Sequence, residues 1–185
     1  AGATVEVTSK IDLSNLTVKG AAAGGFIGKA IKLRLGAENK KVTCPKTVGD
    51  VNSGNVGGFV GEVSFGSSVA FTGNHQIDTG EGVTLAGKSN ESNGVGAAIG
   101  KLNFDNSTKT VSFNGGTFKS TYGNGGAAAV FGGLVGSVRG YTNSKPLHIE
   151  NVTTEFALEA TSTFAGGLVG WLGRDVGATL EVKNA

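Results

Sequence analysis

The stretch Asn55–Val63, NVGGFVGEV, decides the fold because it recurs along the chain. Each copy begins and ends with glycine and holds two adjacent apolar residues before the last glycine. Glycine inside a strand costs about 0.5–1 kcal/mol relative to alanine, so a pattern that keeps repeating it must serve geometry. The copies are GGFIG (24–28), GGFVG (57–61), GAAIG (96–100), GGLVG (132–136) and GGLVG (166–170).

The spacing of these copies predicts a stacked repeat. Their last glycines are separated by 33, 39, 36 and 34 residues, which is typical of a solenoid whose loops vary in length. The related segments GATVEV (2–7) and GATLEV (177–182) lie 175 residues apart, or five periods of 35. Units of this size cannot bury a face alone, so they are expected to stack on one another.

The segments between the glycine copies alternate apolar and polar residues, which predicts strands and no helix. A column of apolar triplets comprises VEV (5–7), VTC (42–44), VAF (69–71), VSF (111–113), LHI (147–149) and LEV (180–182). Further strands are predicted in NLTVKG (15–20), GVTLAG (82–87), GTFKST (116–121) and TEFALEA (154–160). We therefore expect residues 1–185 to form one all-β domain, a right-handed parallel β-helix (β-solenoid) of about five coils with roughly 35 residues per coil. We further expect it to be a fragment of a larger surface protein.

Treating GGFVGEV as one strand assigns its two faces. One face would point into the core through Phe59 and its equivalents, which are Phe26, Ala98, Leu134 and Leu168. The other face would carry a column with opposite charges on neighbouring coils, formed by Lys29, Glu62, Lys101, Ser137 and Trp171. The same outer face would hold an aliphatic rank, formed by Ile27, Val60, Ile99, Val135 and Val169.

An aliphatic rank on an outer face has three explanations. It is covered by the long connections, turned inward by a bulge, or open as a binding surface. Trp171, the only tryptophan, lies beside this rank in the last coil, either as a plug at the end of the stack or as a ligand platform. The residues that would form a binding surface are Trp171, Val169, Val135, Val60 and Ile99.

Composition excludes several classes of partner. The 185 residues carry a net charge of +2, which gives no argument for nucleic acid or an anionic membrane. No apolar run approaches the roughly 20 residues of a membrane span, so no membrane insertion is expected. Cys44 is the only cysteine, so it cannot form an internal disulfide, and its place in an alternating run predicts a buried small hydrophobe.

Candidates for chemistry are weak, and we predict no catalytic, cofactor-binding or metal-binding residue. A carbohydrate-active β-helix enzyme needs clustered carboxylates, but the acidic residues here are mostly isolated. His75 and His148 have no metal-spaced partner. The oxygen-rich loops DTGEG (78–82) and NFDNST (103–108), and GRDVG (173–177), are typical of turns. KAIKLRL (29–35) predicts a solvated basic strand face, or a contact for an acidic glycan.

The segments GGLVGSV (132–138) and GGLVGWL (166–172) resemble the GLUG motif, a glycine repeat of large bacterial surface and secreted proteins that include adhesin-like proteins. The third copy departs from it at Ala97 and Ala98, and the Cys-Tyr-Ala-Thr-Gly run common after that motif is absent. The resemblance implies a bacterial extracellular repeat module. The motif carries no catalytic or ligand residues, so none is transferred to this chain.

The leading expectation is a non-catalytic, adhesin-like module at the bacterial cell surface or secreted. It would bind a host glycoprotein, glycan or immunoglobulin, and would contact other domains of its parent protein. The loops 73–94 and 114–130 have the largest length excess and are further places for ligand contact. The alternatives are a purely structural stalk or spacer that binds nothing, and a carbohydrate-active β-helix enzyme.

Overall fold

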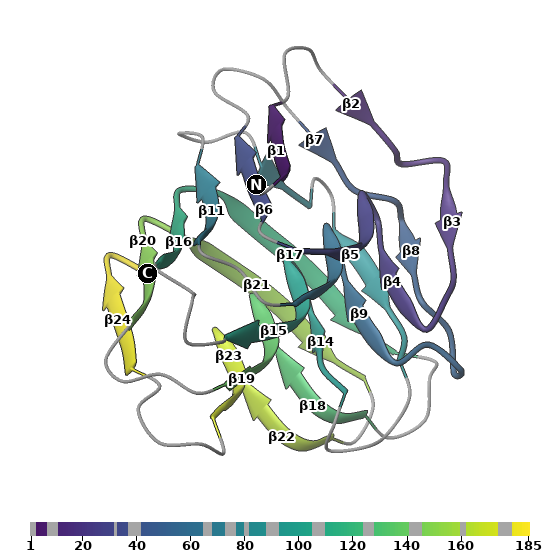
Figure 1. The fold of residues 1–185 in the computed structure, drawn as a ribbon. Helices are drawn as coiled ribbons and strands as arrows, with labels where there is room; N and C mark the ends of the chain where they lie inside the picture. Colours follow the sequence, from purple (N-terminus) through teal and green to yellow (C-terminus); the bar gives the residue numbers. More distant parts are fainter. Residues whose placement is uncertain are drawn as a thin grey trace.

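The computed structural model describes residues 3–6, 11–31, 33–36, 42–64, 68–72, 77–79, 82–87, 93–104, 110–123, 128–140, 146–159, 162–173 and 179–185. These residues form 24 short strands and no helix (Figure 1). Every strand pairing within the described ranges is parallel. The prediction of an all-β chain with parallel pairing is confirmed.

The strands form five sheets, which we number in the order in which the chain first enters them. Sheet I contains β1 (Ala3–Glu6), β6 (Leu33–Gly36), β11 (Ser68–Thr72), β16 (Thr110–Asn114), β20 (Pro146–Glu150) and β24 (Thr179–Lys183). Sheet II contains β2 (Ile11–Asp12), β7 (Val42–Thr43) and β12 (Ile77–Asp78). Sheet III contains β3 (Thr17–Val18), β8 (Thr47–Val48), β13 (Val83–Leu85), β17 (Thr117–Tyr122) and β21 (Thr153–Leu158). Sheet IV contains β4 (Ala22–Gly24), β9 (Asn55–Gly57), β14 (Val95–Gly96), β18 (Ala128–Gly132) and β22 (Ser162–Gly166). Sheet V contains β5 (Ile27–Ala30), β10 (Val60–Val63), β15 (Ile99–Phe104), β19 (Val135–Gly140) and β23 (Val169–Leu172).

The chain visits these sheets in a repeating order and then returns to Sheet I. Each strand therefore pairs with its counterparts from the preceding and the following turn, and not with its neighbour in sequence. Figure 1 shows this as ribbons of different colour, and so from distant parts of the sequence, lying side by side in one sheet. The architecture is that of a parallel β-solenoid, because turns of chain stack and share their sheets.

The glycine copies form a column, as predicted. The first glycines of successive copies pair in Sheet IV, in the order Gly24, Gly57, Gly96, Gly132 and Gly166. However, each copy is not one strand. A bend at Gly58 and Phe59 separates β9 from β10, so the copy is a corner that carries the chain from Sheet IV into Sheet V.

Close backbone approach at this corner explains the glycines. A Cβ atom built on Gly136 would lie 2.5 Å from the Gly100 carbonyl oxygen and 2.6 Å from the Gly94 carbonyl carbon. A Cβ atom on Gly61 would lie 2.6 Å from the carbonyl oxygen of Gly28. Real Cβ atoms essentially never approach backbone so closely, so the last position of each copy selects glycine because Sheets IV and V are pressed together there.

The corner also changes which side chains are buried. Phe59 and Val60 are adjacent and both fully buried, because two-residue alternation holds only within a strand and the bend interrupts it. The predicted core positions Phe59, Ala98 and Leu134 are confirmed. Their equivalents Phe26 and Leu168, in the first and last copies, are half-buried.

The prediction that the aliphatic rank faces outward is wrong for its central members. Val60, Ile99 and Val135 are each 0% exposed and belong to the core. Ile27 and Val169, in the first and last copies, are half-buried and pack against that core. The strip is thus part of the interior and not an open surface.

The apolar triplets are correct over most of the chain. Phe71, Phe113, Ile149 and Val182, which end four of the triplets, follow one another in register in Sheet I. VTC (42–44) instead begins in Sheet II, and the second-turn member of Sheet I is LRL (33–35). In the first turn it is Val5, not Val7, that falls in this column, since Val5 pairs with Leu35.

Two further strand predictions have opposite outcomes. The four segments NLTVKG, GVTLAG, GTFKST and TEFALEA all contribute strands to Sheet III, as expected. KAIKLRL is not one basic strand, because the chain leaves Sheet V after Ala30 and enters Sheet I at Leu33.

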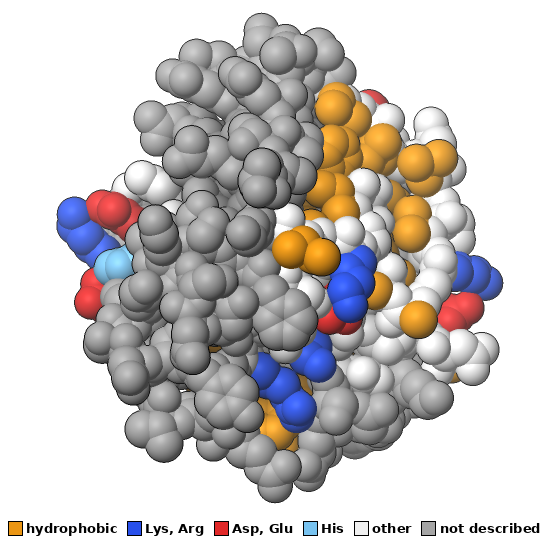
Figure 2. Space-filling view, in the orientation of Figure 1, with side chains coloured by type: hydrophobic (Ala, Val, Ile, Leu, Met, Phe, Trp, Pro, Cys, Tyr) orange, Lys and Arg blue, Asp and Glu red, His pale blue; other side chains and the backbone are white. Residues whose placement is uncertain are grey.

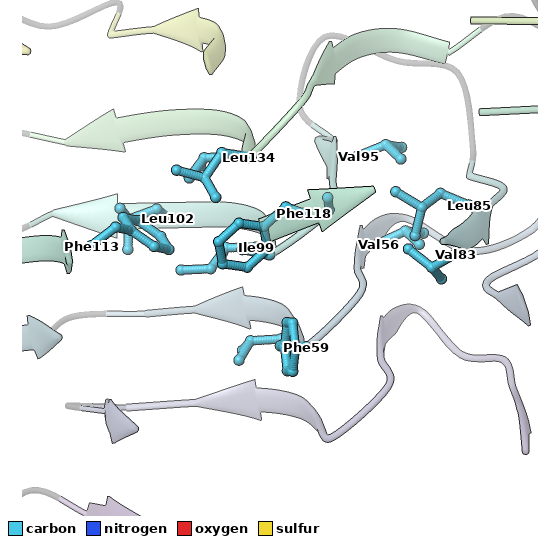
Figure 3. Close-up of a cluster of buried hydrophobic side chains, with 14 of the residues drawn as sticks. Val56, Phe59, Val83, Leu85, Val95, Ile99, Leu102, Phe113, Phe118 and Leu134 are labelled. Carbon is cyan, nitrogen blue, oxygen red and sulfur yellow. The ribbon is translucent and has the colours of Figure 1, made fainter. Parts of the chain in front are cut away.

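The core lies between the sheets and is rich in aromatic rings (Figure 3). Phe59 meets Phe118 edge to face with ring centroids 6.1 Å apart, and Phe131 lies between Tyr122 and Phe156 at 5.7 and 5.4 Å. Such pairs add about 0.5–1.5 kcal/mol to the burial of the rings.

Polar atoms near the core are satisfied locally. The Tyr122 hydroxyl donates to the Gly87 carbonyl at 3.3 Å, and burial raises the pKa of Tyr122 against the opposing effect of that hydrogen bond. Cys44 is buried, as predicted, and its thiol donates to the Gly58 carbonyl at 3.0 Å. No helix in the described ranges has the length and apolar character to cross a membrane.

Candidate binding surface

Two columns of side chains meet at the corner between Sheets IV and V, and their members are always seven residues apart. Asn55 Nδ2 donates to Glu62 Oε2 at 3.0 Å. In the last turn the corresponding pair is Phe164 and Trp171, whose ring centroids lie 5.7 Å apart at an interplanar angle of 33°. In chain order the paired positions are Ala22 and Lys29, Asn55 and Glu62, Gly94 and Lys101, Val130 and Ser137, and Phe164 and Trp171.

Glu62 is the centre of the polar half of this corner. Lys29 Nζ lies 3.1 Å from Glu62 Oε1, the Ser64 hydroxyl donates to the same oxygen at 2.6 Å, and Asn103 Nδ2 donates to it at 3.3 Å. Burial acts to raise the pKa of Glu62, but Ser64, Lys29 and Lys101 together outweigh it and lower the pKa. Glu62 is therefore held as an anion. The predicted register of Lys29, Glu62 and Lys101 is confirmed.

Positive charge gathers in the next turns. Burial lowers the pKa of Lys101, the nearby Arg139 lowers it further, and Glu62 opposes both. Arg139 lies in β19 and pairs in register with Asn103 of β15, which places it one turn beyond Lys101. Figure 2 shows Lys and Arg side chains beside a carboxylate near the middle of this face.

Aromatic side chains end the surface in the last turn. The Arg139 guanidinium carbon lies 4.8 Å from the centroid of the Trp171 ring, within the range of a cation–π contact. Phe164 is 41% exposed beside Trp171, which is half-buried. We define the seam surface as the side chains of Lys29, Glu62, Lys101, Arg139, Phe164 and Trp171.

The structure brings only one of the predicted binding residues into this surface. Trp171 belongs to it, whereas Val169 is half-buried in the preceding part of β23. Val60, Ile99 and Val135 are too buried to touch a ligand in this structure.

Sequence reasoning missed Arg139 and Phe164 in the seam surface. Phe164 stands seven residues before Trp171, the same separation as between Asn55 and Glu62. The constant length of the corner was the signal that could have found this pairing.

The remaining candidates have structural roles or lie outside the described residues. His148 Nδ1 lies 2.8 Å from Glu181 Oε2 on exposed strands of Sheet I. His75, Asp105, Arg174 and Asp175 fall outside the described residues, as do parts of the loops 73–94 and 114–130. In the described ranges, no group of three His, Cys, Asp or Glu residues could hold a metal ion.

Comparison with known proteins returns no match, whether against protein-family models, curated proteins or solved structures.

Proposed function

We propose that this chain is a non-catalytic, adhesin-like repeat module of a bacterial surface or secreted protein, and that it binds a host glycoprotein, glycan or immunoglobulin through the seam surface. In this proposal the solenoid is a right-handed parallel β-helix of about five coils, and it contacts other domains of a parent protein. The similarity of its glycine copies to the GLUG motif supports an extracellular location.

The observation that carries this proposal is the grouping of Lys101, Arg139, Phe164 and Trp171. Arginine and tryptophan are the residues most enriched at energetic centres of protein interfaces. Aromatic rings beside fixed cations also suit sugars that carry a carboxylate, because the ring contacts the sugar face and the cation pairs with the acid.

The state of Glu62 supports a binding role over catalysis. A general acid works best with a pKa near the working pH, which usually requires a raised carboxyl pKa. The surroundings of Glu62 lower its pKa, and its oxygens accept hydrogen bonds from Asn55, Ser64 and Asn103.

A structural stalk is the second candidate, and the burial of Val60, Ile99 and Val135 favours it. An open apolar strip would have been a ready binding surface, but these side chains instead fill the interior. A spacer needs only stacked turns and charge pairs such as Lys29 and Glu62.

The test is binding of the labelled full chain to an array of mucins, acidic and neutral glycans, and immunoglobulins, with Trp171→Ala and Arg139→Gln as variants. Val182→Ala removes an exposed apolar side chain from Sheet I and is the matched control. Saturable binding that falls about tenfold or more in the two seam variants but not in the control supports the proposal. Absence of binding at micromolar concentration would exclude it in favour of the stalk.

A further inference from the structure

The outer edge of β21 leaves core positions uncovered. Phe156 and Leu158 are 41% and 39% exposed, although both continue apolar or buried columns of Sheet III. Leu158 follows Tyr122, Leu85 and Val48 in register, and all three are fully buried. The exposure arises because β21 is the last strand of its sheet.

The backbone of β21 has hydrogen-bonding groups on this open side. The amides of Thr153 and Glu159 donate to β17 and to the residue that follows it in register, at the Gly116 and Tyr122 carbonyls. In a parallel ladder, alternate residues bond to opposite neighbours. The N–H and C=O groups of Thr154, Phe156 and Leu158 therefore point away from β17, where a further strand would pair with them.

Charge at the same edge is negative. Glu155 is more than half exposed and pairs with Lys119 of the preceding strand at 3.1 Å. Glu159, directly after β21, is also exposed. A lysine opposite Glu155 would continue the alternation of charge along this column.

We propose that the β21 edge is a docking site for an extended polypeptide segment that adds to Sheet III as a parallel strand. Read in register with residues 155–159, the segment has the pattern basic, apolar, any residue, apolar, basic. Its apolar side chains cover Phe156 and Leu158, and its basic side chains face Glu155 and Glu159. Main-chain hydrogen bonds give affinity in this mode, and alternate side chains give specificity.

The chain itself supplies a close version of this pattern. Thr17 occupies the same column as Thr47, Thr84, Thr121 and Ala157. Leu16, Val18 and Lys19 therefore stand in the columns of Phe156, Leu158 and Glu159. A synthetic peptide of residues 13–20 that carries Asn15→Lys completes the pattern and is the probe of choice.

Binding of this labelled peptide to the full-length protein by fluorescence anisotropy is the first measurement. We expect saturable binding that Leu158→Lys weakens at least about tenfold, because a charge would be buried under the docked strand. The matched control is Val182→Lys, which alters an equally exposed apolar residue on β24. Circular dichroism melts of both variants verify the fold.

Two N-methylated peptides test the strand register without changing the protein. In this register the amide of peptide residue 17 donates to the Phe156 carbonyl, whereas that of residue 18 points away. Methylation at Thr17 should abolish binding, and methylation at Val18 should leave it within about threefold. Equal losses from both would overturn the proposed parallel register.

A charge exchange tests the acidic contact. Glu159→Lys should weaken the peptide a few-fold, and a peptide with Lys19→Glu should recover that loss. Lack of saturation at about 1 mM peptide, or indifference to Leu158→Lys, would exclude the docking site. These outcomes are independent of the proposed function, since the seam surface contains none of Phe156, Leu158 or Glu159.

Discussion

Asn55 and Glu62 meet side chain to side chain across the corner that joins Sheets IV and V, with Asn55 Nδ2 donating to Glu62 Oε2 at 3.0 Å. The same Asn55 accepts from the Gly94 amide at 3.1 Å through its Oδ1 atom. One amide side chain thus links its own corner to the backbone of the next turn. Glu62 completes the link through Lys29 of the previous turn.

Replacement of Glu62 by glutamine should destabilise the protein by about 1–2 kcal/mol, since hydrogen bonds to charged groups are worth more than neutral ones. The variant keeps the shape of the side chain but leaves Lys29 and Lys101 without their carboxylate. Urea unfolding measures the change. Glu181→Gln, at an exposed ion pair, is the control and should cost less than about 0.5 kcal/mol. Equal costs for the two variants would contradict a special role for Glu62.

Stability should fall in acid partly through Glu62. Its folded-state pKa lies below the ordinary value of 4.5, so folding favours its charged form. This contribution is fully present above about pH 4.5 and disappears as the pH falls through the lower folded-state pKa. Unfolding free energies from about pH 6 to pH 3 should therefore decline less steeply in Glu62→Gln than in the parent protein. Parallel curves would show that Glu62 does not contribute to the acid sensitivity.

Gly136→Ala should destabilise the protein by about 3 kcal/mol or more, because the new methyl group would meet the backbone of Gly94 and Gly100. Gly167→Ala is the matched control within the identical last copy of the motif. A Cβ atom there has only the Phe156 ring within 4 Å, at 3.9 Å. Thermal melts should show a large loss for the first variant and a change within about 1 kcal/mol for the second. Similar melting points would refute the close-approach explanation of the glycine column.

Ser137→Ala should stabilise the protein by up to about 1 kcal/mol. The Ser137 hydroxyl is fully buried between Lys101 and Trp171 in the register of Sheet V, and among the described residues it has no hydrogen-bond partner. An unsatisfied buried polar group carries its desolvation cost without compensation. Chemical unfolding checks the sign, and a loss of stability would indicate a bond that this geometry lacks.

The sequence predicted the repeat and most of the register, because glycine spacing and apolar triplets are local signals. The pairing of Phe71 with Phe113, and of Gly57 with Gly96, follows directly from them. The burial of Val60 could not be predicted in the same way. Two-residue alternation was carried across Gly58 and Phe59, where the chain in fact bends into another sheet.

The seam surface was predicted in its charged column but not in its aromatic end. Lys29, Glu62 and Lys101 follow from their fixed distance to the last glycine of each copy. Phe164 enters through the opposite side of the corner, so its position depends on how sharply the chain turns. That angle is a property of the stacked backbones, and no short stretch of sequence reports it.

The unbroken glycine column makes the height of every loop a matter of counting. Each turn raises the chain by one strand spacing, about 4.8 Å, and the corner holds that rise constant whatever the length of the intervening segment. A duplicated turn would lengthen the molecule by the same step while preserving all existing neighbours except at the insertion point. The protein thus has the construction of a ruler, whose graduations are set by Gly28, Gly61, Gly100, Gly136 and Gly170.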